Sequence, residues 1–262
     1  MTCSACLTIP PVVKTDYTPK GTYENIAGLK TYSTGSSNST KTLLAVYDIF
    51  GFAPQTLQGA DILATALNIR VLIPDLLNGR YAQGEWYAPS AGEAEKKAQG
   101  EFMGFVMGWD AFVPKMKEVM EAAGTGEGKV WAGYGLCWGG KLIAQTSTTS
   151  THFKASAQIH PGFLASTDAE AVTIPHMVLA SKDEDPVVVG EYKSIVEKRG
   201  GKVETFAVMP HGRVTLSFFE SEMEVLIRYR WMGARANFDD EEGLKEYERG
   251  YTALAEFLKG YL

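Results

Sequence analysis

The chain has 262 residues, of which 45% are hydrophobic, and its 31 acidic and 25 basic side chains give a net charge of −6. This composition excludes a disordered or fibrous chain, because it supplies enough apolar surface to offset the entropy lost on folding. The negative charge and a pI near 5.4 argue against partners such as nucleic acids or anionic membranes, which require a basic face. No apolar run reaches the roughly 18 residues that span a bilayer, so we expect no membrane insertion.

The chain has only three cysteines, Cys3, Cys6 and Cys137, which is not the even, dispersed set that a disulfide framework requires. The first residues also lack the pattern of a signal peptide, so we expect a cytoplasmic location. Cys3 and Cys6 have the spacing of half a zinc site, but no second pair of cysteines or histidines follows at metal spacing. We therefore predict neither a metal nor another cofactor.

Apolar runs alternate with amphipathic segments along most of the chain. Residues 1–40 indicate only short extended pieces and turns. The predicted strands are 42–51, 70–77, 129–136, 155–160, 174–181 and 203–208, and the predicted helices are 54–67, helical material over 92–122, a helix around 142–148 and one over 241–260. This order predicts one α/β domain over 1–262, with a mostly parallel, doubly wound sheet, helices on both faces and a ligand site at the carboxyl ends of the strands.

The segment Gly135-Leu136-Cys137-Trp138-Gly139 follows a predicted strand and precedes a predicted helix. This is the pattern of a nucleophile elbow, in which a sharp turn exposes the nucleophile and the flanking glycines avoid collisions with the neighbouring strand and helix. The helix N-terminus would favour a thiolate on Cys137, and the Trp138 backbone N–H would face a developing oxyanion. The alternative is a buried structural cysteine in a glycine-rich turn.

Partners for Cys137 follow in the order nucleophile, acid, histidine that this kind of elbow uses. Asp183 comes directly after the strand 174–181, and His211 lies in the loop after the strand at 203–208. His211 would accept the Cys137 proton, and Asp183 would hold the imidazole in the right tautomer. Because three carboxylates are adjacent here, Asp185 stays open as the alternative acid.

The loop after the first buried strand supplies a second candidate for the oxyanion hole, the Ile49 backbone N–H. Asp48, in the same loop, is expected close enough to Cys137 to affect its protonation. Because an adjacent carboxylate disfavours the thiolate, the resting nucleophile could be a neutral thiol. The alternative role for Asp48 is a turn cap.

Short motifs are spread over most of the chain, and each is weak alone but specific in combination with the others. They are Cys3-x-x-Cys6, YDIFG (47–51), PDLLNG (74–79), GYGLCWGG (133–140), IHPGF (159–163), SKDEDP (181–186), PHG (210–212) and WMGARANFDDEEGLKEYERGY (231–251). Together they resemble the dienelactone hydrolase family, and in particular its fungal members. The resemblance implies an α/β-hydrolase fold, a Cys-His-Asp triad of Cys137, His211 and Asp183, and oxyanion donors from Ile49 and Trp138.

The resemblance also implies substrate contacts. Arg80 and Arg235 are candidates to anchor a substrate carboxylate, with a solvent-exposed surface arginine as the alternative for each. Family members often carry Glu where this chain has Asp48. The expected partner is a small lactone or ester, bound by a monomer or a homodimer.

One segment departs from the fungal pattern, in which the histidine motif continues directly as His-Gly-Trp-Met-x-Ala-Arg. Here 18 residues, 213–230, separate His211-Gly212 from Trp231. The segment is interpreted either as a lid-like loop or as a retained intron in the gene sequence.

The sequence therefore predicts a hydrolase that cleaves a small lactone or ester through Cys137, with carboxymethylenebutenolidase-like activity. The alternative is a catalytically impaired or purely ligand-binding member of the same fold, because the insertion lies next to His211. A redox role for Cys137 ranks lowest, since no resolving cysteine lies nearby in the sequence.

Overall fold

The structure is a computed structural model that describes residues 17–206 and 231–262. Eight strands form one sheet, in the order β1-β2-β4-β3-β5-β6-β7-β8. Strands β3 to β8 run parallel to one another. At one edge, β2 pairs antiparallel with β4, and β1 pairs antiparallel with β2. The strands are β1 (Thr22–Ile26), β2 (Leu29–Gly35), β3 (Lys41–Val46), β4 (Arg70–Pro74), β5 (Val130–Leu136), β6 (Phe153–Ile159), β7 (His176–Ser181) and β8 (Lys202–Phe206).

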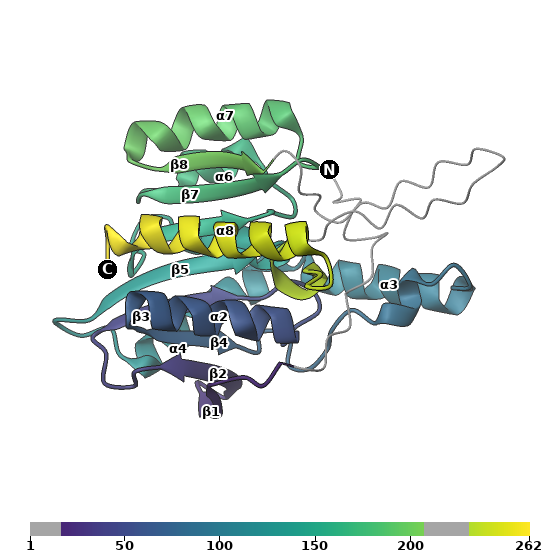
Figure 1. Cartoon of the computed structure of the whole chain (residues 1–262), viewed down its shortest axis with the longest axis horizontal. Coiled ribbons are helices and arrows are strands. Elements are labelled where there is room, and N and C mark those ends of the chain that lie inside the picture. Colours follow the sequence, from purple (N-terminus) through teal and green to yellow (C-terminus); the bar gives the residue numbers. More distant parts are fainter. Residues whose placement is uncertain (1–16, 207–230) are drawn as a thin grey trace.

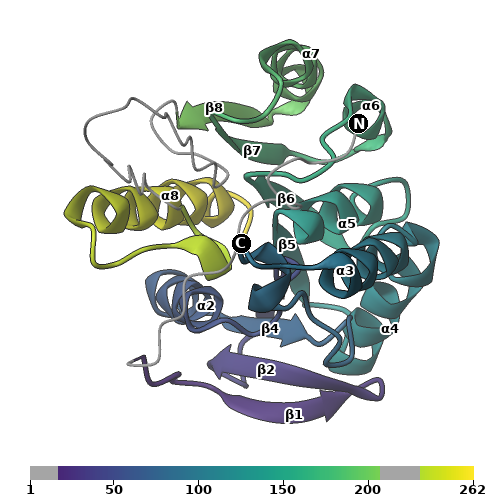
Figure 2. The ribbon, with the colours of Figure 1, turned by 90° about the vertical axis from the view of Figure 1, so that its right-hand side faces the viewer.

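Helices cover both faces of this sheet (Figure 1). The α-helices are α2 (Pro54–Leu67), α3 (Glu93–Val106), α4 (Val113–Ala123), α5 (Trp138–Thr146), α6 (Ser166–Ala171), α7 (Pro186–Val196) and α8 (Glu241–Lys259), with short 3-10 turns η1 (Gly84–Tyr87), η2 (Trp109–Ala111), η3 (Glu197–Arg199) and η4 (Gly233–Arg235). Figure 2 shows α2 and α8 on one face and α4, α5 and α6 on the other. The predicted α/β class with a doubly wound sheet is therefore confirmed.

All six predicted strands are present, but two of them end early. The strand predicted over 42–51 ends at Val46, because the Gly51 N–H donates to the Asp48 carbonyl and closes a turn, in which Gly51 has a φ of 72°. The strand predicted over 70–77 ends at Pro74, where the Asn78 N–H closes a similar turn on Asp75. Residues 47–51 therefore form a loop at the carboxyl end of β3.

The other differences lie in elements without a strong apolar period. Strand β1 is mostly exposed, whereas β2 alternates irregularly between buried and exposed residues, and α6 and α7 are short. The sequence predicted only short extended pieces over 1–40 and neither of these helices. The helical material over 92–122 is two helices, because the chain turns at Gly108 and α4 restarts with a proline in its first turn.

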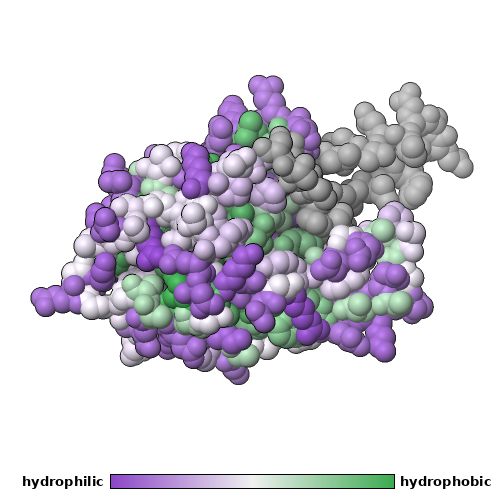
Figure 3. Space-filling view, turned by 90° about the horizontal axis from the view of Figure 1, so that it is seen from below, coloured by the Kyte–Doolittle hydropathy of each residue, from purple (hydrophilic) through white to green (hydrophobic). Residues whose placement is uncertain are grey.

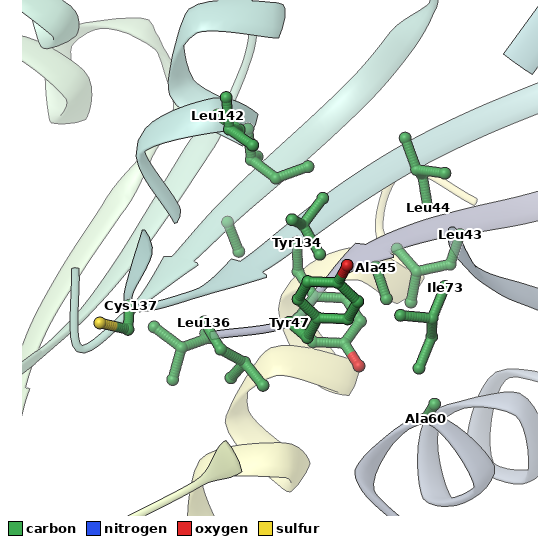
Figure 4. Packing of buried hydrophobic residues seen from close by; sticks show 14 of the residues in the cluster. Leu43, Leu44, Ala45, Tyr47, Ala60, Ile73, Tyr134, Leu136, Cys137 and Leu142 are labelled. Atoms are coloured by element: carbon green, nitrogen blue, oxygen red, sulfur yellow. The ribbon is translucent and has the colours of Figure 1, made fainter. Parts of the chain in front are cut away.

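The hydrophobic core lies between the central strands and the helices on either side. Figure 4 shows side chains from β3, β4 and β5 packed around Tyr134, while the sulfur of Cys137 points away from them at the end of β5. In the face of the molecule seen in Figure 3, hydrophilic residues form most of the rim and hydrophobic residues lie between them. Within the described residues, no helix combines the length and the apolar character needed to cross a membrane.

Candidate active site

Cys137 occupies the sharp turn between β5 and α5, with a φ of 51° and a ψ of −111°. A positive φ is costly for a residue other than glycine, and such strain gathers at functional sites. A Cβ at Gly135 would collide with the Gly139 backbone, and a Cβ at Gly139 would collide with the carbonyls of Val46 and Tyr47. The predicted reason for glycine on both sides of the nucleophile is therefore confirmed.

Backbone hydrogen bonds hold this turn against the next strand. The Cys137 N–H donates to the Ile159 carbonyl at 3.0 Å, and the Gly162 N–H donates to the Cys137 carbonyl at 3.1 Å. The exposure that the elbow pattern predicts for Cys137 is wrong, because Cys137 is fully buried. It is the N-cap residue of α5. The positive end of the helix dipole therefore lies beside the thiol, where it favours the thiolate.

The two candidate oxyanion donors lie at the ends of adjacent strands. Trp138 is the first residue of α5, and Ile49 lies in the loop after β3, which pairs directly with β5. The Ile49 carbonyl accepts the Ala82 N–H at 2.9 Å, and the Trp138 indole donates to the Val106 carbonyl at 2.8 Å. These two hydrogen bonds hold Ile49 through its carbonyl and Trp138 through its indole, so neither bond uses the backbone N–H that is the candidate oxyanion donor.

Asp48 lies fully buried in the same loop. Its Oδ1 accepts the Phe50 N–H at 2.9 Å, so it does cap its own turn, and its Oδ2 accepts the Ala234 N–H at 3.0 Å. Burial raises the pKa of the Asp48 carboxyl, and Cys137 raises it further, whereas the Arg235 guanidinium and the Phe50 N–H act to lower it. The charge of Asp48 is therefore coupled to that of Cys137, as the sequence predicts.

The two candidate substrate arginines lie in different surroundings. Arg235 is buried, with its guanidinium 4.7 Å from the centre of the Phe50 ring. Its charge acts on Asp48, so it belongs to the group around the nucleophile. Arg80 is exposed and lies over the Phe105 ring at 4.5 Å.

His160 is a residue of this group that sequence reasoning missed. It directly follows β6 and is 2% exposed, with a φ of 37°, and its ring centre lies 6.1 Å from that of Trp231. Its electrostatic interaction with Asp48 acts against the rise that burial causes in the pKa of that carboxyl. The available signal was its position at the end of a strand in IHPGF, next in the sheet to the strand that carries Cys137.

The three adjacent carboxylates after β7 have different roles. Asp185 is the N-cap of α7, where its Oδ1 accepts the Val187 N–H at 2.8 Å, and Glu184 Oε2 accepts the Ser181 N–H. Asp183 has an exposed side chain, and its own N–H donates to Ser181 Oγ at 3.3 Å. The choice of Asp183 as the acid stays a prediction.

Several predicted features fall outside the described residues. These are His211, the segment 213–230, and the cysteines at positions 3 and 6. In the ranges 17–206 and 231–262, no group of three or more His, Cys, Asp or Glu side chains is arranged to hold a metal ion.

The sequence of the chain matches the family model described as the dienelactone hydrolase family over residues 29–261. The chain belongs to this family. It is also 32% identical over 253 residues to an AIM2 family protein of Schizosaccharomyces pombe, covering 94% of this chain and 93% of that relative. The resemblance to fungal members of the dienelactone hydrolase family is therefore confirmed, and the chain is a hydrolase by family.

Solved structures support the fold. A putative dienelactone hydrolase from Klebsiella pneumoniae aligns with a TM-score of 0.63 and 12% identity, over 91% of this chain and 99% of that one. A dienelactone hydrolase-like promiscuous phosphotriesterase from metagenomic libraries aligns with a TM-score of 0.59 and 17% identity, over 93% and 98%. At these identities the likeness concerns the α/β-hydrolase fold alone.

Proposed function

We propose that this member of the family hydrolyses a small lactone or ester with Cys137 as the nucleophile. The observation that carries the proposal is the backbone of Cys137, held at a positive φ between β5 and α5 by glycines that no larger residue could replace. A structural cysteine in a turn needs no such strain, whereas a nucleophile that must project from a strand end does.

The proposed reaction has two steps. His211 takes the thiol proton, and Cys137 Sγ attacks the carbonyl carbon, whose oxygen accepts hydrogen bonds from the Ile49 and Trp138 N–H groups. The C–O bond to the alkoxide then breaks, and His211 returns the proton to the leaving oxygen. In the second step water attacks the thioester carbonyl and gives a proton to His211. The C–S bond then breaks, the carboxylic acid is released, and His211 returns the proton to the Cys137 sulfur. Asp183 is the proposed partner that orients His211.

The two arginines would adapt this site to an anionic substrate. An ionised Asp48 beside the thiol would favour a neutral thiol. A substrate carboxylate would be attracted by Arg235, which is buried beside Asp48, or by the exposed Arg80. The proposed substrate is thus a small molecule with a lactone or ester group and a carboxylate, and the proposed activity is carboxymethylenebutenolidase-like.

The test is hydrolysis of p-nitrophenyl acetate and of a panel of lactones by the full chain and by Cys137→Ala. We expect the variant to lose turnover while keeping its circular dichroism spectrum. A matched control with both Cys3→Ala and Cys6→Ala, which leaves Cys137 as the chain's remaining thiol, should keep full activity and give an acyl-enzyme adduct by mass spectrometry. Undiminished turnover in Cys137→Ala would refute the proposal.

A second candidate function is ligand binding without turnover. It is favoured by the three carboxylates after β7, because Asp185 is engaged as a helix cap and Asp183 is exposed. If this candidate holds, thiol reagents label Cys137 and lactones shift the melting temperature, yet no ester is hydrolysed. Loss of activity in Asp183→Asn, with normal folding, would instead support the triad.

A further inference from the structure

A short loop after β6 wraps around the nucleophile. Within His160–Phe163, two residues other than glycine have a positive φ, His160 at 37° and Phe163 at 62°. A bulky aromatic residue rarely adopts this conformation, which costs roughly 1–3 kcal/mol unless its surroundings impose it. The loop is held to Cys137 at both ends, since Ile159 accepts the Cys137 N–H and Gly162 donates to the Cys137 carbonyl.

Gly162 is the loop residue that lies against the reacting atoms. A Cβ built there would lie 3.3 Å from Cys137 Sγ and 3.5 Å from the Trp138 backbone nitrogen. A point about 3 Å from both the nucleophile and an oxyanion donor is where a reacting acyl group must fit. The missing side chain of Gly162 therefore leaves room beside both of these groups.

Phe163 follows Gly162 and carries an aromatic ring. Its half-buried ring packs edge-on against Trp109 at a centroid distance of 5.4 Å, and Trp109 in turn lies 6.3 Å from the Trp138 ring. Lys141 Nζ approaches the Phe163 carbonyl at 3.5 Å and is itself paired with Asp168 at 2.6 Å. These contacts hold the Phe163 backbone in its strained conformation.

We propose that Gly162, Phe163 and Trp109 form the acyl-selecting wall of the site and favour flat acyl groups, such as aryl acyls. This inference rests on the proposed role of Cys137 as nucleophile. The missing side chain of Gly162 leaves room for a group beside the sulfur, and the aromatic pair supplies a face on which a planar group packs. Neither function requires Phe163 to touch the scissile carbonyl itself.

The experiment compares p-nitrophenyl benzoate with p-nitrophenyl acetate in the full chain and in Phe163→Leu. Leucine keeps the apolar character and the backbone demand of position 163 but removes the aromatic face. We expect the ratio of kcat/KM for benzoate over acetate to fall about tenfold, the typical effect of one good aromatic contact. The matched control is Phe257→Leu, a half-buried aromatic of α8 that pairs with Tyr261, and it should leave the ratio unchanged.

A second measurement needs no turnover. Iodoacetamide and N-benzyl iodoacetamide alkylate Cys137 at rates that peptide mass spectrometry resolves from the labelling of other cysteines. Phe163→Leu should lower the benzyl-to-unsubstituted rate ratio by a similar factor. Gly162→Ala should slow both reagents, because a methyl group would fill the space beside Sγ, and it adds no backbone strain since Gly162 does not have a positive φ.

The outcomes separate the two proposals. Unchanged ratios for Phe163→Leu in both measurements would overturn the acyl-selecting wall while leaving Cys137 as a nucleophile. If no ester is hydrolysed but the alkylation ratio falls, the wall is supported and the hydrolytic function fails.

Discussion

Asp48 and Ala234 are 186 positions apart in the sequence, yet the Ala234 N–H donates to Asp48 Oδ2 at 3.0 Å in the buried interior. This bond joins the loop after β3 to η4, which in the sequence comes after β8 and residues 207–230. Gly233 leaves the room for it, because a Cβ there would lie 2.9 Å from the same oxygen. Arg235 follows Ala234 and its charge acts on Asp48, so this bond ties η4 and Arg235 to the loop that precedes α2.

Substitution of Asp48 by Asn should destabilise the fold by about 1–3 kcal/mol. The two carboxylate oxygens accept from two backbone donors, Phe50 and Ala234. An asparagine has only one oxygen, so its amide group must face the other N–H and leave that donor unsatisfied. Urea unfolding followed by tryptophan fluorescence measures the loss.

The control for this prediction is Asp185→Asn. Asp185 accepts one backbone N–H as the N-cap of α7, and asparagine is an equally good N-cap. We expect little change in the free energy of unfolding. Equal effects of the two substitutions would contradict the role assigned to the buried pair of hydrogen bonds.

The sequence predicted the elements that bury a continuous apolar run. Strands β3 to β8 have such runs, and the elbow at Cys137 has a glycine pattern with a single steric explanation. Helix α2 was predicted with the bounds that the structure has. Strands β1 and β2 were predicted only as short extended pieces, because they lie antiparallel at one edge of the sheet and their burial follows no regular period.

The candidate site was predictable in its nucleophile and less so in its surroundings. Asp48 was predicted near Cys137 from its place in the loop after the first buried strand, and Arg235 was assigned from a motif resemblance. In the structure, Asp48 interacts electrostatically with both Cys137 and Arg235. His160 was missed because a single histidine after a strand belongs to no periodic pattern. It lies near Cys137 only because β5 and β6 are neighbours in the sheet. The carboxylates after β7 were not distinguishable, because their roles depend on how α7 begins.

The elbow glycine at position 139 should tolerate no side chain. In Gly139→Ala the methyl group would meet the Val46 and Tyr47 carbonyls, and because backbone cannot move aside cheaply we expect a loss of about 3 kcal/mol or more. The matched control is Gly104→Ala in α3, where a Cβ has no heavy atom within 4 Å. That variant should gain up to about 1 kcal/mol, because alanine is a better helix former. Thermal unfolding of both proteins checks the opposite signs, and a stable Gly139→Ala protein would contradict the steric account of the turn.

His176 predicts a dependence of stability on pH. The side chain is fully buried between β6 and α7, with Nδ1 2.7 Å from Ser156 Oγ and Nε2 3.0 Å from Gln158 Nε2. Burial lowers the pKa of His176 from 6.5 to about 3. Between these values the unfolded chain binds a proton that the folded chain does not, so the free energy of unfolding falls as the pH drops below about 6.5.

The measurement is urea unfolding at several pH values between 4 and 8. We expect His176→Gln to have a lower stability overall and a slope below pH 6.5 that is smaller by one proton than in the unsubstituted protein. The corresponding control is His152→Gln at a half-exposed position, which should leave the slope nearly as it was. Identical slopes for His176→Gln and the unsubstituted protein would show that His176 is not held neutral.

The ion pair between Lys141 and Asp168 should give a coupling free energy of unfolding that exposed ion pairs lack. Its Nζ and Oδ2 atoms are 2.6 Å apart, and each side chain is only 12% exposed. Lys141→Met should cost about 2–3 kcal/mol, because Asp168 loses a charged partner in a place where little water can replace it.

A double-mutant cycle of Lys141→Met and Asp168→Asn isolates the pair, and the combined variant should be clearly more stable than the sum of the single losses implies. The same cycle at Lys97 and Glu101, an exposed pair on α3, should show almost no coupling. Because Lys141 also approaches the Phe163 carbonyl, Lys141→Met should in addition lower the benzoate-to-acetate preference. Additive losses at Lys141 and Asp168 would mean that the pair is no stronger than an exposed one. An unchanged benzoate-to-acetate ratio in Lys141→Met would mean that the Phe163 loop does not depend on Lys141.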